Sequence, residues 1–395
     1  MGLIKNFENL ATTPQRKIVL ELIEAGLDAI QPEVVFKKNV SLEGATLHIL
    51  DSKYDLKEYE HIYLIGFGKG SGKNAKLLED LLGEKLTEGY VIDTTPQEFA
   101  RINFTLGTHP LPSQTNLDFT KSVVDRFENK VSEKDLILVV VAGGGSVLFE
   151  LPASRQGGPE SLSLDELIKK DDELLKSGLT ISQMNDERKK LSRVKAGGLA
   201  RILYPAKVVG LIFSDVPGND ISVVASGPTD EENAENILVL SNKTALLAME
   251  EKAREFGINA RIYSDSFQSE AKTAGQKLIE QTQPDEILLV GGETTVHVTG
   301  NGKGGRNLEV VLGALPYLDE KTVIASFDSD GWDNCESAGA IGDFQTVENA
   351  KNQSLNIEDH LKNNNSFDFF EKTNDAIITG RLPSNISDLI IVYKS

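Results

Sequence analysis

The segment from Ile65 to Lys76, IGFGKGSGKNAK, combines four glycines with three lysines and could hold a phosphate group. Glycines allow a ligand to approach the backbone closely, and a helix starting here would offer free N–H groups. It is not a Walker A loop, because Phe67 and Asn74 stand where Gly and Ser or Thr are required. The alternative is a tight strand-to-helix turn with solvated lysines. Lys69 or Lys73 could supply the cation. We favour phosphate binding, with Gly68 and Lys69 as the candidate residues.

A second glycine-rich segment, AGGGSVLFELP, begins at Ala142. Three consecutive glycines are costly in backbone entropy, which suggests that something approaches this backbone closely. Close packing of a helix on a sheet would explain them equally well. Ser146 lies outside a G-x-S-x-G elbow, so a hydrolase nucleophile is not indicated. The N–H groups that could bind a carboxylate or phosphate are those of Gly143, Gly144, Gly145 and Ser146.

The segment SDVPGND places Asp215 where a strand is expected to end. A carboxylate in that position could accept a hydroxyl proton, or hold Mg²⁺ through a water molecule. The alternative is an aspartate that forms a turn by bonding its own backbone. Asp215 is therefore a candidate catalytic residue and a candidate metal ligand.

The segment from Gly291 to Asn307, GGETTVHVTGNGKGGRN, contains six glycines together with Glu293 and Arg306. Its middle alternates like a hairpin that ends in an Asn-Gly turn. Arginine is the side chain best suited to bidentate recognition of phosphate or carboxylate. We interpret Glu293, Arg306 and Asn307 as binding candidates, and His297 as a structural residue on a strand face.

Two further segments carry charged candidates. The cation-rich stretch NDERKKLSRVKAGG, from Asn185, is predicted to be helical and by default solvated, but Lys195 near its end could point into a cleft. The acidic loop FDSDGWDN contains Asp330 and could hold a divalent ion, although its spacing does not fit an EF-hand. No His and Cys cluster with zinc spacing occurs in the sequence.

Buried strands must position these groups. Nearly continuous apolar runs alternate with helical segments, which predicts a parallel sheet covered on both faces. Ligands then gather beyond the carboxyl ends of the strands, where the glycines and acids lie. We place a domain join near residue 236, giving domains 1–235 and 236–395. The runs are IYLIG, YVID, LILVVVAGGG, VVGLIFSD, EILLVGGE, VIASFDSD and LIIVY.

Composition limits the possible partners. The net charge of −19 repels a polyanion, so a nucleic-acid partner is not expected, whereas a small anionic metabolite remains compatible. No apolar run approaches the ~20 residues that span a bilayer, and the N-terminus is too polar for a signal peptide. Cys335 is the only cysteine, which fits a reducing cytoplasm. We expect a cytoplasmic monomer or homodimer.

Seven segments in order resemble the glycerate kinases that carry a MOFRL domain. The resemblance implies a Rossmann-like doubly wound parallel domain, a smaller α/β MOFRL domain and an active-site cleft between them. It also implies ATP and Mg²⁺ as cofactors and phosphorylation of D-glycerate to 2-phosphoglycerate. The matching segments are GFGKGSGKNA, GTHPLPSQTN, AGGGSVLFELP, LKSGLTISQMNDERKKLSRVKAGGLA, SDVPGNDISVVASGPT, GGETTVHVTGNGKGGRN and TGRLPSNISDL.

By the same resemblance, Lys69 and Arg306 would clamp the transferring phosphoryl group, and Asp215 would orient or deprotonate the attacking hydroxyl. Two other functions stay open. An NAD(P)H-dependent hydroxypyruvate reductase would need a complete dinucleotide fingerprint, and this one is broken at Ser71. Asp93, however, follows at about the sequence spacing of the acid that binds the ribose in such enzymes. A non-catalytic protein that binds sugar phosphates or acids would use the same glycine loops without turning ATP over.

Overall fold

The computed structural model describes residues 2–153, 162–177, 179, 183, 186–187 and 190–395. The chain forms two compact units, one of residues Pro32–Leu240 and the other of Met1–Gln31 with Ser241–Ser395. The sequence placed the join near residue 236 and assigned the N-terminus to the first domain. In the structure the boundary follows residue 240, and the N-terminal residues pack with the C-terminal ones.

The N-terminal helix α2 (Pro14–Ala29) explains this grouping. Thr13 caps it by accepting a hydrogen bond from the N–H of Arg16. Its apolar face packs on α10 (Asn242–Glu255), so closely that a Cβ on Gly26 would collide with Met249. The buried guanidinium of Arg16 binds Asp343, with Nε 2.7 Å from Oδ2. Helix α2 is therefore part of the C-terminal unit.

Unit 32–240 is built on a six-stranded parallel sheet in the order β6-β5-β4-β7-β8-β9. This third-second-first-fourth-fifth-sixth order is that of doubly wound Rossmann folds, so the predicted α/β class is confirmed. The order reverses between β4 and β7. The strands are β4 (His61–Phe67), β5 (Glu88–Asp93), β6 (Ile102–Leu106), β7 (Asp135–Val141), β8 (Lys207–Phe213) and β9 (Ala234–Leu240).

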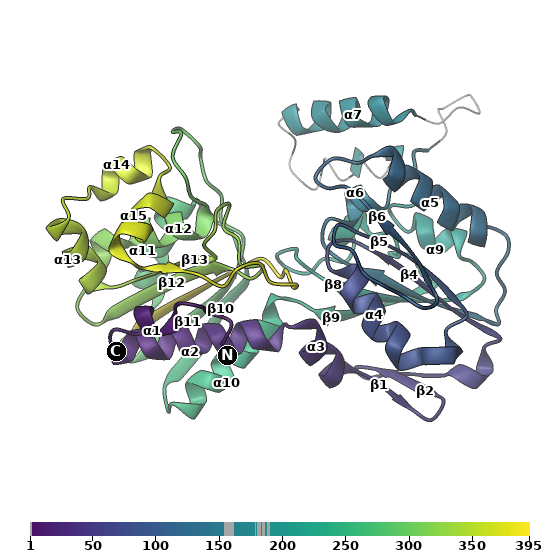
Figure 1. Ribbon diagram of the computed structural model, residues 1–395, viewed down its shortest axis with the longest axis horizontal. Coiled ribbons are helices and arrows are strands. Elements are labelled where there is room, and N and C mark those ends of the chain that lie inside the picture. Colours follow the sequence, from purple (N-terminus) through teal and green to yellow (C-terminus); the bar gives the residue numbers. More distant parts are fainter. Residues whose placement is uncertain (1, 154–161, 178, 180–182, 184–185, 188–189) are drawn as a thin grey trace. The chain divides into compact units, whose positions relative to one another are not determined.

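Helices cover both faces of this sheet (Figure 1). Alternate side chains of β4 and β7 pack with α5 and α9 in one apolar core, and the intervening ones are buried too. Burial on both sides explains the continuous apolar runs. The remaining elements are α3 (Pro32–Asn39), a hairpin sheet of β1 (Val40–Glu43), β2 (Thr46–Ile49) and β3 (Ser52–Asp55), η1 (Leu56–Glu58), α4 (Ser71–Leu82), η2 (Gly83–Lys85), α5 (Gln114–Phe127), α6 (Gly145–Leu148), α7 (Leu164–Lys176), α9 (Gly198–Ile202) and η3 (Val224–Ser226).

The C-terminal unit contains a six-stranded mixed sheet in the order β10-β11-β15-β12-β13-β14. The sequence predicted parallel strands here as well, which is wrong for most of the sheet: β10 and β11 are parallel, but the final strand β15 inserts antiparallel between β11 and β12. A continuous apolar run indicates that a strand is buried on both faces, but it does not indicate the direction of that strand. The strands are β10 (Asn259–Phe267), β11 (Glu286–Gly292), β12 (Thr322–Asp328), β13 (Gly339–Gly342), β14 (Ala376–Ile377) and β15 (Asp388–Lys394).

The mixed sheet also has helices on both sides, with α2 and α10 on one face and α11 and α12 on the other (Figure 1). Buried side chains of α11, α12, β11, β12 and β15 form its core. The helices not yet given are α1 (Phe7–Leu10), α11 (Ala271–Gln281), α12 (Arg306–Ala314), η4 (Leu315–Tyr317), α13 (Phe344–Asn352), α14 (Ile357–Lys362) and α15 (Ser366–Thr373).

Candidate functional site

The loops that follow β4 and β7 are bonded to each other where the strand order reverses. Gly68 has a φ of +109° and packs against Ala142, whose carbonyl oxygen would collide with any Cβ at residue 68. The N–H of Lys69 donates to the carbonyl of Gly143 at 2.8 Å. Both glycine segments therefore reach one place at the carboxyl edge, which is where doubly wound sheets bind ligands.

At the start of α4, a protein carboxylate occupies one of the N–H groups that we expected to face an anion. Asp93, at the end of β5, accepts from the N–H of Gly72 at 2.9 Å and from the N–H of Thr94 at 2.6 Å. Its carboxylate is buried. Burial raises the pKa of Asp93, and these N–H groups oppose that rise. Asp93 is thus a helix cap and is not available to a ribose, which removes the residue that had supported dinucleotide binding.

Three polar side chains gather over the glycine turn after β7. A Cβ on Gly143 would collide with the carboxylate of Asp215. At Gly144, whose φ is +73°, a Cβ would lie 3.1 Å from Nε2 of His109 and 3.6 Å from Cε of Lys69. The structure therefore brings Asp215, Lys69 and His109 to one turn.

His109 was missed by the sequence reasoning. It is the third residue after β6, in the segment GTHP, so its place soon after a strand at the carboxyl edge was the available signal. Burial lowers the pKa of His109 to about 4, and the nearby charge of Lys69 contributes. Its imidazole is therefore neutral near pH 7.

Lys69 and Asp215 have complementary environments. Lys69 is exposed, and within the described ranges it forms no ion pair. Asp215 is half-buried: burial raises the pKa of its carboxyl group, while the charge of Lys69 opposes the rise. A free cation and a carboxylate of raised proton affinity thus lie beside the same backbone turn.

Ser146 is the second residue of the short helix α6, and its hydroxyl has a protein partner. Its Oγ lies 3.0 Å from Oγ of Ser226. Ala225 and Ser226 have φ values of 49° and 63°, a left-handed conformation that is unfavourable for residues with side chains. Gly145 packs beneath this segment, and a Cβ there would lie 2.9 Å from Cβ of Ala225.

Lys195 does not present a free amine. It is buried and forms an ion pair with the equally buried Glu150. It lies in a turn rather than at a helix end: the next helix begins at Gly198, and Asn185, where the predicted helix started, lies outside the described residues. This placement favours a structural role for Lys195.

Arg306, the first residue of α12, is surrounded by carboxylates in the C-terminal unit. Its Nε lies 2.6 Å from Oδ2 of Asp388 and its Nη1 2.8 Å from Oε1 of Glu293. Its Nη2 lies 3.5 Å from Oδ2 of Asp328. The Asp388 side chain is 2% exposed and the Glu293 side chain 44%. One edge of the guanidinium is therefore held by the buried Asp388, and the other edge contacts the partly exposed Glu293.

Asn307 is fully buried, and its side chain is occupied by protein groups. Its Nδ2 donates to Asp388 at 2.8 Å, and its Oδ1 accepts from Ser326 at 2.6 Å. Asp333 caps the same helix by accepting from the N–H groups of Asn307 and Leu308. Burial raises the pKa of Asp333 to about 7, and Asp388 adds to the rise. Asn307 therefore orients Asp388 rather than facing a ligand directly.

Asp330 lies in the acidic loop after β12. Its N–H donates to Asp328 at 3.1 Å, and its Oδ1 accepts from the N–H of Trp332 at 2.9 Å. Burial, together with Asp388 and Asp330, raises the pKa of Asp328 well above its usual value. Within the described ranges, no group of three or more His, Cys, Asp or Glu side chains could hold a metal ion.

The predicted hairpin in the segment after Glu293 is not formed. Residues 296–304 contain no strand, and His297 is exposed rather than on a strand face. The backbone is held instead by Asn364, whose Oδ1 accepts from the N–H groups of Thr299 and Gly300 at 2.8 and 2.9 Å. The alternating sequence does not form a hairpin, because the side-chain amide of Asn364, from a distant segment, bonds the backbone N–H groups here.

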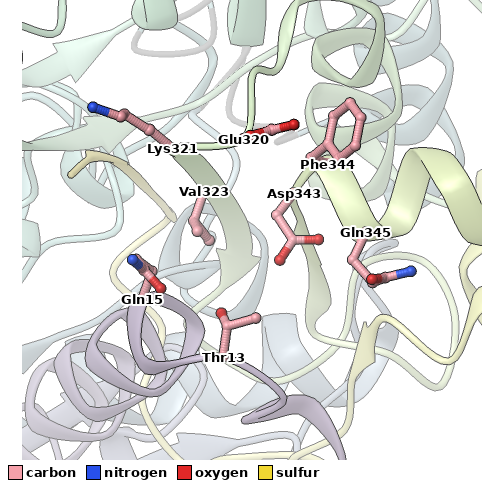
Figure 2. A pocket seen from close by; sticks show the side chains of 8 residues that line it. All are labelled: Thr13, Gln15, Glu320, Lys321, Val323, Asp343, Phe344 and Gln345. Atoms are coloured by element: carbon pink, nitrogen blue, oxygen red, sulfur yellow. The ribbon is translucent and has the colours of Figure 1, made fainter.

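A pocket of about 170 Å³ lies at the other end of β12 (Figure 2). Asp328 and Arg306 mark the carboxyl end of that strand, and seven residues of strand span about 20 Å, so the pocket is remote from them. Asp343 in its wall is bonded to Arg16 through both carboxylate oxygens. The lining residues are Thr13, Gln15, Glu320, Lys321, Val323, Asp343, Phe344 and Gln345.

In the part of the chain that the structure describes, no helix is both long and apolar enough to cross a bilayer.

Family models match both units of the chain. The domain of unknown function DUF4147 matches residues 18–256, and the MOFRL family matches residues 286–388. The D-glycerate 2-kinase of Thermotoga maritima is 31% identical over 95% of this chain and 97% of its own length. The glycerate 2-kinase of Pyrococcus horikoshii is 29% identical over 95% and 96%, and human glycerate kinase 26% over 94% and 92%.

A solved structure agrees with the sequence matches. The crystal structure of glycerate kinase from Thermotoga maritima has a TM-score of 0.83 at 30% identity, covering 96% of this chain and 99% of that one. A protein of Pyrococcus horikoshii has a TM-score of 0.84 at 27% identity, covering 97% and 99%. The similarity thus extends over both units.

Proposed function

Since the chain belongs to the glycerate kinase family that joins a DUF4147 domain to a MOFRL domain, we propose that it transfers the γ-phosphoryl group of ATP to the 2-hydroxyl of D-glycerate. The observation that carries the proposal is the turn at Gly143 and Gly144, where the free cation of Lys69 lies beside the carboxylate of Asp215. Phosphoryl transfer depends chiefly on positioning and on neutralising charge, and this turn has groups suited to both.

Asp215 is assigned to the attacking hydroxyl. Burial raises the proton affinity of its carboxylate, which suits a group that accepts a proton as the oxygen attacks phosphorus. Lys69 is assigned to the transferring phosphoryl group, because its amine has no other ion partner within the described ranges. The backbone N–H groups of Gly143, Gly144 and Ser146 are proposed to hold anionic oxygens of the substrates. The N–H of Gly145, which we had included, already donates to the carbonyl of Ala142 at 3.1 Å.

Arg306 is assigned to phosphate binding through its outer edge. Asp388 fixes Nε, whereas Nη1 is bound to the half-exposed Glu293 and Nη2 is only 3.5 Å from Asp328. A phosphate oxygen can replace Glu293 at low cost, since a solvent-exposed ion pair is worth about 0–1 kcal/mol. Glu293 then keeps the guanidinium in place until substrate arrives.

Magnesium fits the available donors if the nucleotide supplies most of its ligands. Mg²⁺ keeps several waters and usually takes only one or two protein carboxylates beside substrate phosphates, which agrees with the absence of a three-carboxylate cage among the described residues. Asp215, in the unit of residues 32–240, and Asp330, in the other unit, are two separate candidates for a protein ligand. When bound, the ion would neutralise charge on the phosphate oxygens.

The test is a coupled assay of ADP formation with Mg²⁺ATP and a panel of hydroxy acids, in which D-glycerate is expected to be the preferred acceptor. Phosphorus-31 and carbon-13 NMR of the product then distinguishes 2-phosphoglycerate from the 3-isomer. ATP turnover that no hydroxy acid stimulates would contradict the proposal. Oxidation of NADH by hydroxypyruvate without ATP would instead support a reductase.

A further inference from the structure

The loop that carries His109 is tied firmly to the glycine turn. The side chain of Asn116, which is fully buried, donates to the carbonyl of Thr108 at 3.0 Å and accepts from the N–H of Thr108 at 3.0 Å. The same amide donates to the carbonyl of Val147 in α6 at 3.1 Å. One buried asparagine therefore holds the residue before His109 against the helix that begins at Gly145, so the position of the imidazole relative to the turn is well defined.

The imidazole of His109 points a polar atom at this turn. From the position that a Cβ of Gly144 would occupy, Nε2 of His109 is 3.1 Å away and Cε of Lys69 3.6 Å. Within the described part of the chain, the ring makes no hydrogen bond or ion pair. A half-buried imidazole with an open hydrogen-bonding nitrogen beside a lysine is an arrangement suited to a ligand.

The protonation state of His109 determines which interactions its ring can make with a ligand. Burial and Lys69 keep its pKa at about 4, so near pH 7 the ring is neutral, with one N–H donor and one acceptor nitrogen. It therefore adds no second cation next to Lys69. An anionic oxygen at the turn would select the tautomer protonated on Nε2, because that tautomer donates a hydrogen bond to it.

We propose, on the basis of the kinase function above, that His109 binds the acceptor by donating a hydrogen bond from Nε2 to the carboxylate of the hydroxy acid. We favour the acceptor over the nucleotide as the ligand of His109 because the side chains of Asp215 and His109 lie against neighbouring glycines, Gly143 and Gly144. These consecutive residues have Cα atoms about 3.8 Å apart, so one small molecule can place its hydroxyl at Asp215 and its carboxylate at His109. His109 would then select 2-hydroxy acids over simple alcohols.

The test compares His109→Phe and His109→Gln in the full-length enzyme, with His61→Phe as a matched control. Phenylalanine keeps a planar ring without the donor, and glutamine restores an N–H near the position of Nε2. His61 lies at the opposite end of β4, where it pairs with Asp135 at 2.9 Å. We expect His109→Phe to raise the KM and the calorimetric Kd for D-glycerate about 10- to 100-fold, the loss of one hydrogen bond to a charged group.

The KM for ATP should change less than about threefold in His109→Phe, and His109→Gln should regain most of the affinity for D-glycerate. An unchanged KM for D-glycerate in His109→Phe, or a rise in the KM for ATP instead, would overturn the assignment. Should His109→Phe fold poorly, nitrogen-15 NMR of the wild-type imidazoles gives an independent readout. The Nε2 resonance of His109 should shift on addition of D-glycerate, and no shift would refute the contact.

The two proposals can fail separately. If the wild-type protein binds D-glycerate and shifts the His109 resonance but does not phosphorylate it, the kinase function fails and the contact stands. If the protein phosphorylates D-glycerate and His109→Phe does so with wild-type KM, the kinase function stands and the contact fails.

Discussion

The carboxylate of Asp388 holds Nε of Arg306 at 2.6 Å and is itself oriented by the buried amide of Asn307 at 2.8 Å. The guanidinium is thereby fixed on its inner edge while its outer edge faces Glu293. This arrangement separates two consequences of changing Arg306, one for stability and one for turnover.

Arg306→Ala should lower kcat by at least ~10²-fold, the effect of removing a preorganised charge stabiliser. The same change leaves Asp388 buried without its cation, so a loss of about 3–5 kcal/mol in unfolding free energy is expected as well. Steady-state kinetics and urea unfolding measure the two effects. Arg261→Ala is the matched control, because it removes the cation that Glu286 binds at 2.8 Å at the opposite end of β11 from Glu293, and it should leave kcat nearly unchanged. Wild-type turnover in Arg306→Ala would refute the role.

Lys69→Ala should lower kcat by at least ~10²-fold without destabilising the fold, since Lys69 is exposed and unpaired within the described ranges. Lys73→Ala is the control from the same glycine loop. Lys73 pairs with Glu33 on the surface at 2.6 Å, so its loss should change stability by less than about 1 kcal/mol and leave turnover intact. Equal kinetic effects of the two changes would show that general positive charge, and not Lys69, is required.

Asp215→Asn should lower kcat more than it raises the KM for D-glycerate if the carboxylate accepts the hydroxyl proton. Because burial raises the pKa of Asp215, the acid limb of the kcat profile should lie at a higher pH than the ordinary titration of an aspartate, with activity falling as the carboxylate becomes protonated. The limb should vanish in the variant. A change in KM alone would restrict Asp215 to binding.

Asp333 gives a prediction for stability. Burial raises its pKa to about 7, so the folded state keeps a proton that the unfolded state releases near pH 4. The stability from this proton is complete below pH 4 and is lost as the pH rises through 7. Asp333→Asn cannot lose a proton. Its unfolding free energy relative to wild type should therefore rise by about 2 kcal/mol between pH 5.5 and 8.5. Urea unfolding at both values checks this, and a fall would contradict it.

Lys195 can be tested against Glu150. Because both side chains are buried, Lys195→Met should cost about 3–5 kcal/mol by leaving Glu150 without its partner. The double variant Lys195→Met with Glu150→Leu should recover most of that loss. If the recovered double variant also regains kcat, Lys195 is structural. If it folds normally but has lost affinity for either substrate, the earlier interpretation as a ligand-binding residue is correct.

Much of the architecture was readable from local patterns. Continuous apolar runs predicted the buried strands of the parallel sheet, and glycines after β4 and β7 predicted where the backbone is approached closely. Both signals are local, because burial and a positive φ each restrict which residue type can occupy a given position. The sequence also singled out Lys69 and Arg306 by residue type within glycine-rich segments, and Asp215 by its place at the end of a predicted strand. Whether they act together in catalysis stays a prediction.

Tertiary structure alone decided which distant groups meet. The sequence by itself determined that a glycine loop opens α4, but only the fold places Asp93 on that helix start, and only the fold sets β15 antiparallel between β11 and β12. The same long-range packing pairs Lys195 with Glu150 and places the ring of His109 beside Gly144. The physical reason is that side-chain periodicity encodes which faces are buried, whereas strand direction and hydrogen-bond partners depend on the arrangement that satisfies every buried polar group at once.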